Sequence, residues 1–314
     1  MINLVRADFK RIRSRRAVVG VAIGVFLLLF LIDGLQYANA KPRQSTLVQT
    51  VFLSSPPPAE CVLERTPRLE VSEACLGDYG YVEPFIDGQK PTGIEADLYR
   101  IEGATSLETE LGGSIGGWGI GMSLASLIIA ATFIGGDFGT SLVGQMLFEP
   151  RRSRVYASKA LAAVLACGAL TLAVLMLDAV FKYITASSVD AVGNLDGSWY
   201  THRLLDVARV LGCTAAAALT GLGFTMMMRR TAASLGIYFG SAIALQFITA
   251  AETFRPFAKV IPLNAVIFVA MWPSGRPDEH APFQSNGVAV AFLIGWGVIA
   301  TIVGLVAFTR REVR

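Results

Sequence analysis

The chain has 314 residues, of which 53% are hydrophobic and only 16% are charged, and its mean hydropathy is +0.54. Soluble globular domains carry about 25% charged residues, so this composition excludes an ordinary soluble domain. The net charge of +3 is small. Attraction to anionic lipid headgroups accounts for the basic clusters beside the apolar segments, so membrane lipids are expected partners and nucleic acid is not.

The first predicted element is an amphipathic helix over residues 1–16. Its apolar and basic side chains recur at helical spacing on opposite faces, as in helices that lie in a membrane interface; they are Ile2, Val5, Phe9 and Ile12 against Arg6, Lys10 and Arg13. The basic stretch, the apolar run and the Ala-x-Ala in "YANA" also fit a cleavable signal peptide. The uncleaved anchor is favoured, because the apolar run is at the long end for a signal peptide.

Six apolar segments are long enough to cross about 30 Å of hydrocarbon as helices, which takes about 20 residues. The sequence therefore predicts an all-α polytopic membrane protein. Its spans are expected at 17–37, 114–134, 159–181, 205–228, 231–251 and 287–308. The apolar run 260–272, in an outer loop over 252–286, is too short to span and is expected to form a re-entrant or interfacial helix.

Residues 38–113 are the one long segment between spans, and they are expected to form a small extracytoplasmic domain. The segment contains a Pro56-Pro57-Pro58 run, many acids and scattered apolar residues, which favours short helices held together by a disulfide between Cys61 and Cys75. Closing such a loop stabilises a fold by about 3 kcal/mol. Cys167 and Cys213 fall inside spans and are expected to be small apolar fillers.

The distribution of Lys and Arg predicts the orientation. More than half of the 27 basic residues lie in the segments 1–16, 151–159, 229–230 and 309–314, whereas most acids lie in the opposite connections. Basic connections stay on the cytoplasmic side. We therefore expect both termini in the cytoplasm, with 309–314 as a cytoplasmic tail, and the chain in a bacterial plasma membrane.

The segment 135–158, "GGDFGTSLVGQMLFEPRRSRVYAS", is the polar connection between the second and third spans. A Gly-Gly hinge followed by Asp137 as a helix cap predicts a short helix over 140–148. Glu149-Pro150 is expected to end that helix. Arg151, Arg152 and Arg154 would then lie near lipid headgroups, with Tyr156 and Lys159 as interfacial anchors of the next span.

This segment resembles the corresponding stretch of the type-2 ABC exporter permeases. The matching residues follow the family's order of an acid, Gly-Thr, a short helix, a Pro, Ser-Arg and a later Lys; they are Asp137, Gly139-Thr140, Pro150, Ser153-Arg154 and Lys159. Residues 1–16 resemble the family's elbow helix, 252–286 its broken outer helices, and "GLVAFTRREVR" the end of its last span. The resemblance covers nearly the whole chain except 38–113.

The resemblance implies a non-catalytic permease subunit that pairs with a second permease subunit, as a homodimer or with a related chain. It would dock a separate cytoplasmic ABC ATPase, which binds the ATP and Mg²⁺ itself. The docking residues implied are Asp137, Thr140, Glu149, Pro150, Arg151, Arg152 and Arg154. The family exports lipids, glycans, antibiotics or peptides, and a drug-like amphipathic compound or a peptide is favoured here.

Catalytic and metal-binding motifs are absent from the sequence. The two histidines, His202 and His280, both lie in outer loops, and no His-Glu-x-x-His or Cys-x-x-Cys occurs. The glycine-rich run 112–121 lacks the Gly-Lys-Ser/Thr ending of a P-loop. Gly113, Gly117 and Gly121 are instead expected to place small residues on one helix face for close helix packing.

Two other functions remain open. An ion-coupled transporter would use intramembrane acids, and Asp33, Asp178 and Asp206 are the candidates, although each is expected close enough to the outer boundary for headgroup solvation. A membrane-anchored receptor or assembly module would work through its outer domain. Polar residues deeper in the spans would either line a translocation path or hydrogen-bond between helices; they include Ser123, Ser126, Tyr238 and Gln246.

Overall fold

The structure is a computed structural model. It describes residues 2–40, 44–53, 62–65, 69–72, 81–82, 94–102, 107–140, 151–189, 191–193, 195–249, 261–271, 283 and 285–310. The chain divides into two compact units. A helical unit comprises Met1–Gly34, Glu110–Phe181 and Leu195–Arg314, and a second unit comprises Leu35–Thr109 and Lys182–Asn194.

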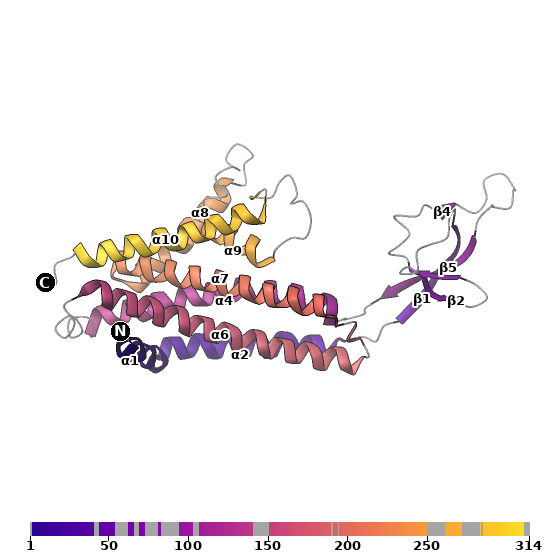
Figure 1. The fold of residues 1–314 in the computed structure, drawn as a ribbon, viewed down its shortest axis with the longest axis horizontal. Coiled ribbons are helices and arrows are strands. Elements are labelled where there is room, and N and C mark those ends of the chain that lie inside the picture. The colour runs from indigo at the N-terminus through magenta and orange to yellow at the C-terminus, as the bar shows by residue number, and fades with distance from the viewer. Residues whose placement is uncertain are drawn as a thin grey trace. The chain divides into compact units, whose positions relative to one another are not determined.

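Eight helices lie in the described residues (Figure 1). They are α1 (Ile2–Ser14), α2 (Arg16–Ala38), α4 (Leu107–Thr140), α6 (Arg152–Ser188), α7 (Gly197–Met228), α8 (Thr231–Thr249), α9 (Pro262–Met271) and α10 (Asn286–Arg310). Five of them, namely α2, α4, α6, α7 and α10, are long and apolar enough to cross a membrane. The chain is therefore a multi-pass helical membrane protein.

These five helices contain five of the six predicted spans. The remaining predicted span, 231–251, coincides with α8, whose described apolar stretch, Thr231–Ala244, is shorter than a full crossing. The sixth span therefore stays a prediction. The short helices α1 and α9 form where the sequence predicts them, over 2–14 and 262–271, while the interfacial position expected of α1 also stays a prediction.

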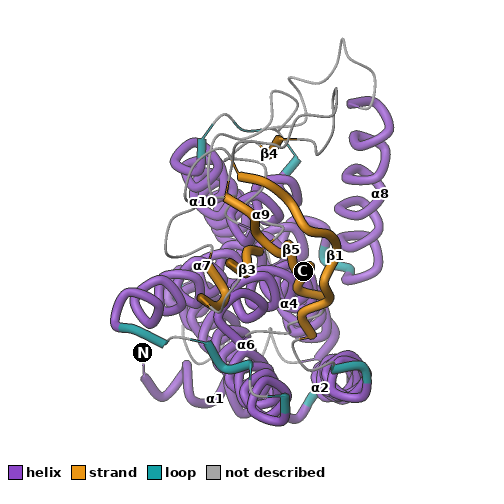
Figure 2. Tube along the Cα trace, turned by 90° about the vertical axis from the view of Figure 1, so that its right-hand side faces the viewer, coloured by secondary structure: helices purple, strands orange, loops and turns teal. Residues whose placement is uncertain are grey.

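The expectation of short helices in segment 38–113 is wrong, because its described residues form a five-stranded sheet (orange in Figure 2). The strands are β1 (Gln44–Leu53), β2 (Val62–Arg65), β3 (Leu69–Ser72), β4 (Tyr81–Val82) and β5 (Ile94–Glu102), in the order β2-β3-β5-β1-β4. β1 and β5 pair antiparallel from Gln44↔Glu102 to Leu53↔Ile94. β1 is rich in Val, Thr and Phe, which favour strands. Cys61 and Cys75 lie outside the described residues.

Glycines let α7 pack closely against both α4 and α10. A Cβ added at Gly221 would overlap the backbone of Leu127 on α4, and one at Gly223 would overlap the carbonyl of Ala300 on α10. Such close approach replaces side-chain packing by backbone contact, as is common between helices in membranes. α7 therefore lies between α4 and α10 (Figure 1).

The predicted packing face of α4 is not the one that packs within the chain. Gly116 and Gly119 make the close contacts, with the carbonyl of Ala270 at 3.0 Å and with Val210 at 2.6 Å from an added Cβ. Among the described residues, no neighbouring atom lies within 4 Å of a Cβ added at the three glycines named from the sequence, Gly113, Gly117 and Gly121. The stripe of glycines therefore lies on an exposed face of α4.

Candidate functional site

The last turn of α4 carries Asp137, and here the structure differs from the prediction. α4 runs without interruption through Gly135 and Gly136 to Thr140, so the two glycines are not a hinge and Asp137 is not a helix cap. Their lack of a side chain serves packing instead: a Cβ at Gly135 would overlap Thr231 at the start of α8, and one at Gly136 would overlap the guanidinium of Arg15. Asp137 itself is fully buried.

Asp137 belongs to a network of buried charges that joins three helices. The Lys159 ammonium, on α6, is 0% exposed and forms ion pairs with Asp137 on α4 and with Asp8 on α1, the latter at 3.4 Å. The Arg15 guanidinium contacts the other Asp137 oxygen at 2.5 Å. The hydroxyl of Ser158 donates a hydrogen bond of 2.9 Å to Asp8. The prediction that Lys159 anchors a span at the interface is therefore wrong. We call Asp8, Arg15, Asp137 and Lys159 the charge network.

The charge network balances its own charges, with two carboxylates against one ammonium and one guanidinium. Burying an ion costs several kcal/mol unless it is paired and hydrogen-bonded. Lys159 meets both carboxylates, and its ammonium also lies 5.1 Å from the centre of the Phe133 ring, a favourable contact for a cation. Displacing α4 or α6 would separate the buried Asp137 and Lys159. Displacing α1 would separate the buried Asp8 from Lys159 and leave it Arg11 of its own helix, at 4.0 Å. The network therefore favours one arrangement of α1, α4 and α6.

A second set of contacts joins the start of α6 to α10. Arg152 donates a 3.0 Å hydrogen bond to the carbonyl of Thr309, at the end of α10, where the helix dipole favours a cation. The Tyr156 hydroxyl donates to the carbonyl of Thr301 at 3.0 Å, and the side chain is buried. The prediction that Tyr156 is an interfacial anchor is therefore wrong. Arg151 and Arg154 are exposed, and their expected place near lipid headgroups stays a prediction.

The remaining predicted docking residues are only partly described. Thr140 is the last residue of α4, and nothing is described of its side chain. Glu149, Pro150 and the predicted short helix lie outside the described residues. What the structure does establish is that residues 141–150 connect two helix ends, α4 and α6, that the charge network joins.

The residues proposed for a translocation path do not share one cavity in the described structure. Ser123 and Ser126 are buried on α4, where Ser123 donates to the carbonyl of Gly119 at 2.7 Å. Tyr238, on α8, is buried against Phe224 with ring centroids 5.9 Å apart. The side chain of Gln246 is outside the described residues.

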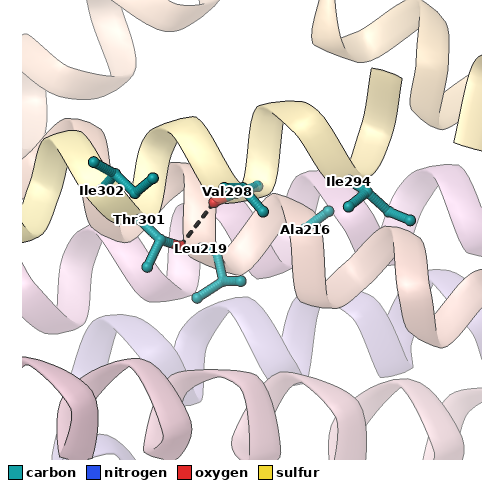
Figure 3. A pocket seen from close by; sticks show the side chains of 7 residues that line it. Ala216, Leu219, Ile294, Val298, Thr301 and Ile302 are labelled. Atoms are coloured by element: carbon teal, nitrogen blue, oxygen red, sulfur yellow. Dashed lines mark hydrogen bonds between the residues drawn. The ribbon is translucent and has the colours of Figure 1, made fainter. Parts of the chain in front are cut away.

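An apolar groove of about 300 Å³ lies instead between α7 and α10 (Figure 3). Its lining residues are Ala216, Leu219, Ile294, Gly297, Val298, Thr301 and Ile302. The one hydroxyl among them, of Thr301, donates to the carbonyl of Gly297 at 2.7 Å. The groove thus presents hydrocarbon to any occupant, and Ser123, Ser126 and Tyr238 are not among its lining residues.

The intramembrane acids are less solvated than predicted. Asp178, on α6, is fully buried and accepts hydrogen bonds from the Ser114 hydroxyl, at 2.7 and 2.9 Å, and from the Trp118 indole N–H at 3.1 Å. Asp33 is also buried. Headgroup solvation therefore does not account for either acid. Asp206 is partly exposed and pairs with Arg203 and Arg209 on its own helix.

Sequence reasoning missed Asp8, Arg15 and Ser158. One signal was available: Asp8 is the first acid of the chain and stands alone in a strongly basic helix, where a solvated role would favour another Lys or Arg. No such signal marks Arg15 among the neighbouring arginines. The pairing of Ser114 and Trp118 with Asp178 has a weak signal, because the two donors are four residues apart and share one face of α4.

Among the described residues, no group of three or more His, Cys, Asp or Glu side chains is placed to hold a metal ion. Comparison with known protein families, with curated proteins and with solved structures found no match to this chain. The function is therefore argued from the geometry of the charge network and the helices that it joins.

Proposed function

We propose that the chain is the permease subunit of an ATP-driven exporter of the type-2 ABC class, which docks a separate cytoplasmic ATPase through the segment 137–149. The observation that carries the proposal is the charge network. It fixes the end of α4 and the start of α6 to each other and to α1, directly beside the segment that would meet the ATPase. A push on that segment would therefore reach several helices at once.

The mechanism follows from this rigidity. ATP and Mg²⁺, held by the partner, would change the conformation of the ATPase, and the permease responds only to the extent that its two states bind the partner with different affinity. A stiff connection between the docking segment and the spans converts a local shift into a rigid-body movement of helices. The buried ion pairs supply stiffness because sliding them apart is costly.

A second permease subunit completes the translocation path in this proposal. The exposed glycine face of α4, with Gly113, Gly117 and Gly121 open to approach, supports a close helix contact with that subunit. We place the pair in a bacterial plasma membrane with both termini cytoplasmic, on the distribution of Lys and Arg. The sheet of 44–102 then belongs to the outer side.

The proposed substrate is an amphipathic drug-like compound or a peptide. The wholly apolar groove between α7 and α10 supports an occupant with a hydrocarbon part, because burial of apolar surface is the only favourable interaction that its lining offers.

Charge reversal at the docking segment tests the proposal. Glu149→Lys and Arg151→Glu are expected to abolish co-purification of the ATPase from detergent-solubilised membranes. Glu110→Lys, at the opposite end of α4, is the matched control and is expected to retain the partner. Size-exclusion profiles equal to wild type would establish that the variants are folded. Full retention of the ATPase by both docking variants would contradict docking through this segment.

An ion-coupled transporter remains the second candidate, because the Asp178 carboxylate is buried inside the bundle and accepts hydrogen bonds from the side chains of Ser114 and Trp118. A buried carboxylate within a span is a common proton or cation site. Asp178→Asn would abolish ion-driven uptake or efflux in vesicles that lack ATP, whereas an ABC permease would show no transport under those conditions with either residue.

A further inference from the structure

We propose that Asp8, Arg15 and Lys159 are positioning residues that carry a displacement of the end of α4 and the start of α6 to α1 and α2. This inference rests on the proposed function, since it assumes that a partner displaces these two helix ends. It adds a route that the sequence does not indicate: α1 is coupled to the docking segment by internal ion pairs as well as by any contact of its own with the partner.

The first step of the route is the ammonium of Lys159, which Asp137 and Asp8 share from two different helices. Asp137 lies three residues before the end of α4, and Asp8 lies in the middle of α1. Both carboxylates and the ammonium are buried. Because water cannot replace a lost partner there, α1 follows the ends of α4 and α6 when they move.

The second step is the contact of Arg15 with Asp137. Arg15 occupies the corner between α1 and α2, and its side chain is 28% exposed. Its guanidinium reaches Asp137 by crossing Gly136, where a Cβ would block it. The Arg15 backbone carbonyl accepts from the Val19 N–H at 3.0 Å, so the residue is continuous with the first turn of α2. A shift of Asp137 is thereby passed to the start of α2.

Hydrophobic packing at the same place makes the joint rigid. Ile12 of α1, Val18 of α2, Phe133 of α4 and Val155 of α6 belong to one buried cluster. Close packing resists compression and transmits displacement. Figure 1 shows α1 beside the start of α6 and the start of α2. The charge network and this cluster together fix the end of α1, the start of α2, the end of α4 and the start of α6 to one another.

Hydrogen–deuterium exchange of the full chain in nanodiscs tests the first step without any partner. Lys159→Met, a substitution on α6, is expected to raise exchange of residues 2–14 by about tenfold or more, because α1 loses its buried anchor and opens locally. Arg16→Gln removes an exposed arginine next to Arg15 and is the matched control, with wild-type exchange expected. Unchanged exchange of residues 2–14 in Lys159→Met would overturn the inference.

The second test uses the complex with the co-purified ATPase, with ATP and vanadate added. In wild type and Arg16→Gln, exchange in residues 2–14, 16–20 and 152–158 is expected to change together. In Asp8→Asn, which removes the carboxylate that Lys159 pairs with on α1, residues 2–14 are expected to lose the response while 152–158 keep it. In Arg15→Gln, residues 16–20 at the start of α2 are expected to lose the response, and Asp8→Glu and Arg15→Lys should restore it in their respective helices. A purely stabilising role would not separate these segments in this way.

The outcomes distinguish the two proposals. If the ATPase never co-purifies, the proposed function fails, and the exchange of Lys159→Met still decides whether α1 is tied to α6. If the ATPase binds, and residues 2–14 respond in Asp8→Asn and residues 16–20 respond in Arg15→Gln as they do in wild type, the proposed function stands and the coupling through the charge network is wrong.

Discussion

Lys159 and Asp137 lie 22 residues apart in the sequence and form an ion pair in which neither side chain is exposed. The pair joins the last turn of α4 to the start of α6. Because both charges are buried, separating them is costly. We therefore expect a displacement of one of these helix ends to carry the other with it.

Replacing Lys159 by Met is expected to lower the free energy of unfolding by about 3–5 kcal/mol, because Asp8 and Asp137 would remain buried without their ammonium. Lys159→Arg keeps the charge and should cost clearly less. Thermal unfolding of the detergent-solubilised protein measures both. Equal stability of wild type and Lys159→Met would show that the pairs contribute no net stability, contrary to this account.

Trp118→Phe is expected to destabilise the helical unit by about 1.5–3 kcal/mol, since it removes a donor to the buried Asp178 carboxylate and keeps an aromatic ring in place. Ser114→Ala, which removes the other side-chain donor, should act in the same direction. Trp296→Phe on α10 serves as a control for loss of an indole elsewhere. If Trp118→Phe and Trp296→Phe lower the free energy of unfolding equally, the hydrogen bond from Trp118 to Asp178 does not contribute to stability.

The glycines predict a contrast between two single substitutions. Gly223→Ala forces a methyl group into the carbonyl of Ala300 and is expected to cost about 1–3 kcal/mol. Gly117→Ala meets no neighbouring atom within 4 Å among the residues that the structure describes. It should leave the folded monomer at least as stable as before, because Ala favours helix over Gly. Denaturant titration of both variants measures the contrast. Similar losses in the free energy of unfolding for Gly223→Ala and Gly117→Ala would refute it.

Asp196 predicts a pH dependence at the start of α7. Its carboxylate caps the helix by accepting the Trp199 N–H at 2.7 Å, and this hydrogen bond lowers the pKa of Asp196 below its ordinary value. The cap therefore stabilises the folded state above the unfolded pKa of about 3.9, and the contribution is lost as the pH falls through the lower, folded value. The stability difference between wild type and Asp196→Ala should shrink in that window. A difference independent of pH from 7 down to 3 would contradict the role.

The helices could be predicted because their signal is local. Apolar runs of about 20 residues identify α2, α4, α6, α7 and α10 whatever their neighbours are. Strands β1 and β5 are hard to predict because their side chains alternate only weakly, and because Cys61 and Cys75 between them favour a disulfide-held segment over the strands that the Val and Thr content of β1 indicates. Strand pairing between residues 44 and 102 is a long-range property that local patterns do not encode.

The sequence indicates where the candidate site lies, but it does not predict which of its residues pair with one another. The sequence indicates both Asp137 and Lys159, one as a helix cap and one as an interfacial anchor, because each role suits its position along the chain. Their pairing, and the part that Asp8 plays in it, depend on how α1, α4 and α6 pack. A charge near a helix end is expected to be solvated unless tertiary contacts bury it, and here they do.

Purification of the full chain from native membranes tests the central claim most directly. The account predicts that a soluble ATPase with a Gly-x-x-x-x-Gly-Lys-Ser/Thr loop co-purifies with the chain, and that the complex hydrolyses ATP. Mass spectrometry of the eluate and an ATPase assay together make the measurement. A chain recovered intact from those membranes with no such ATPase, and with no ATP hydrolysis, would contradict the account.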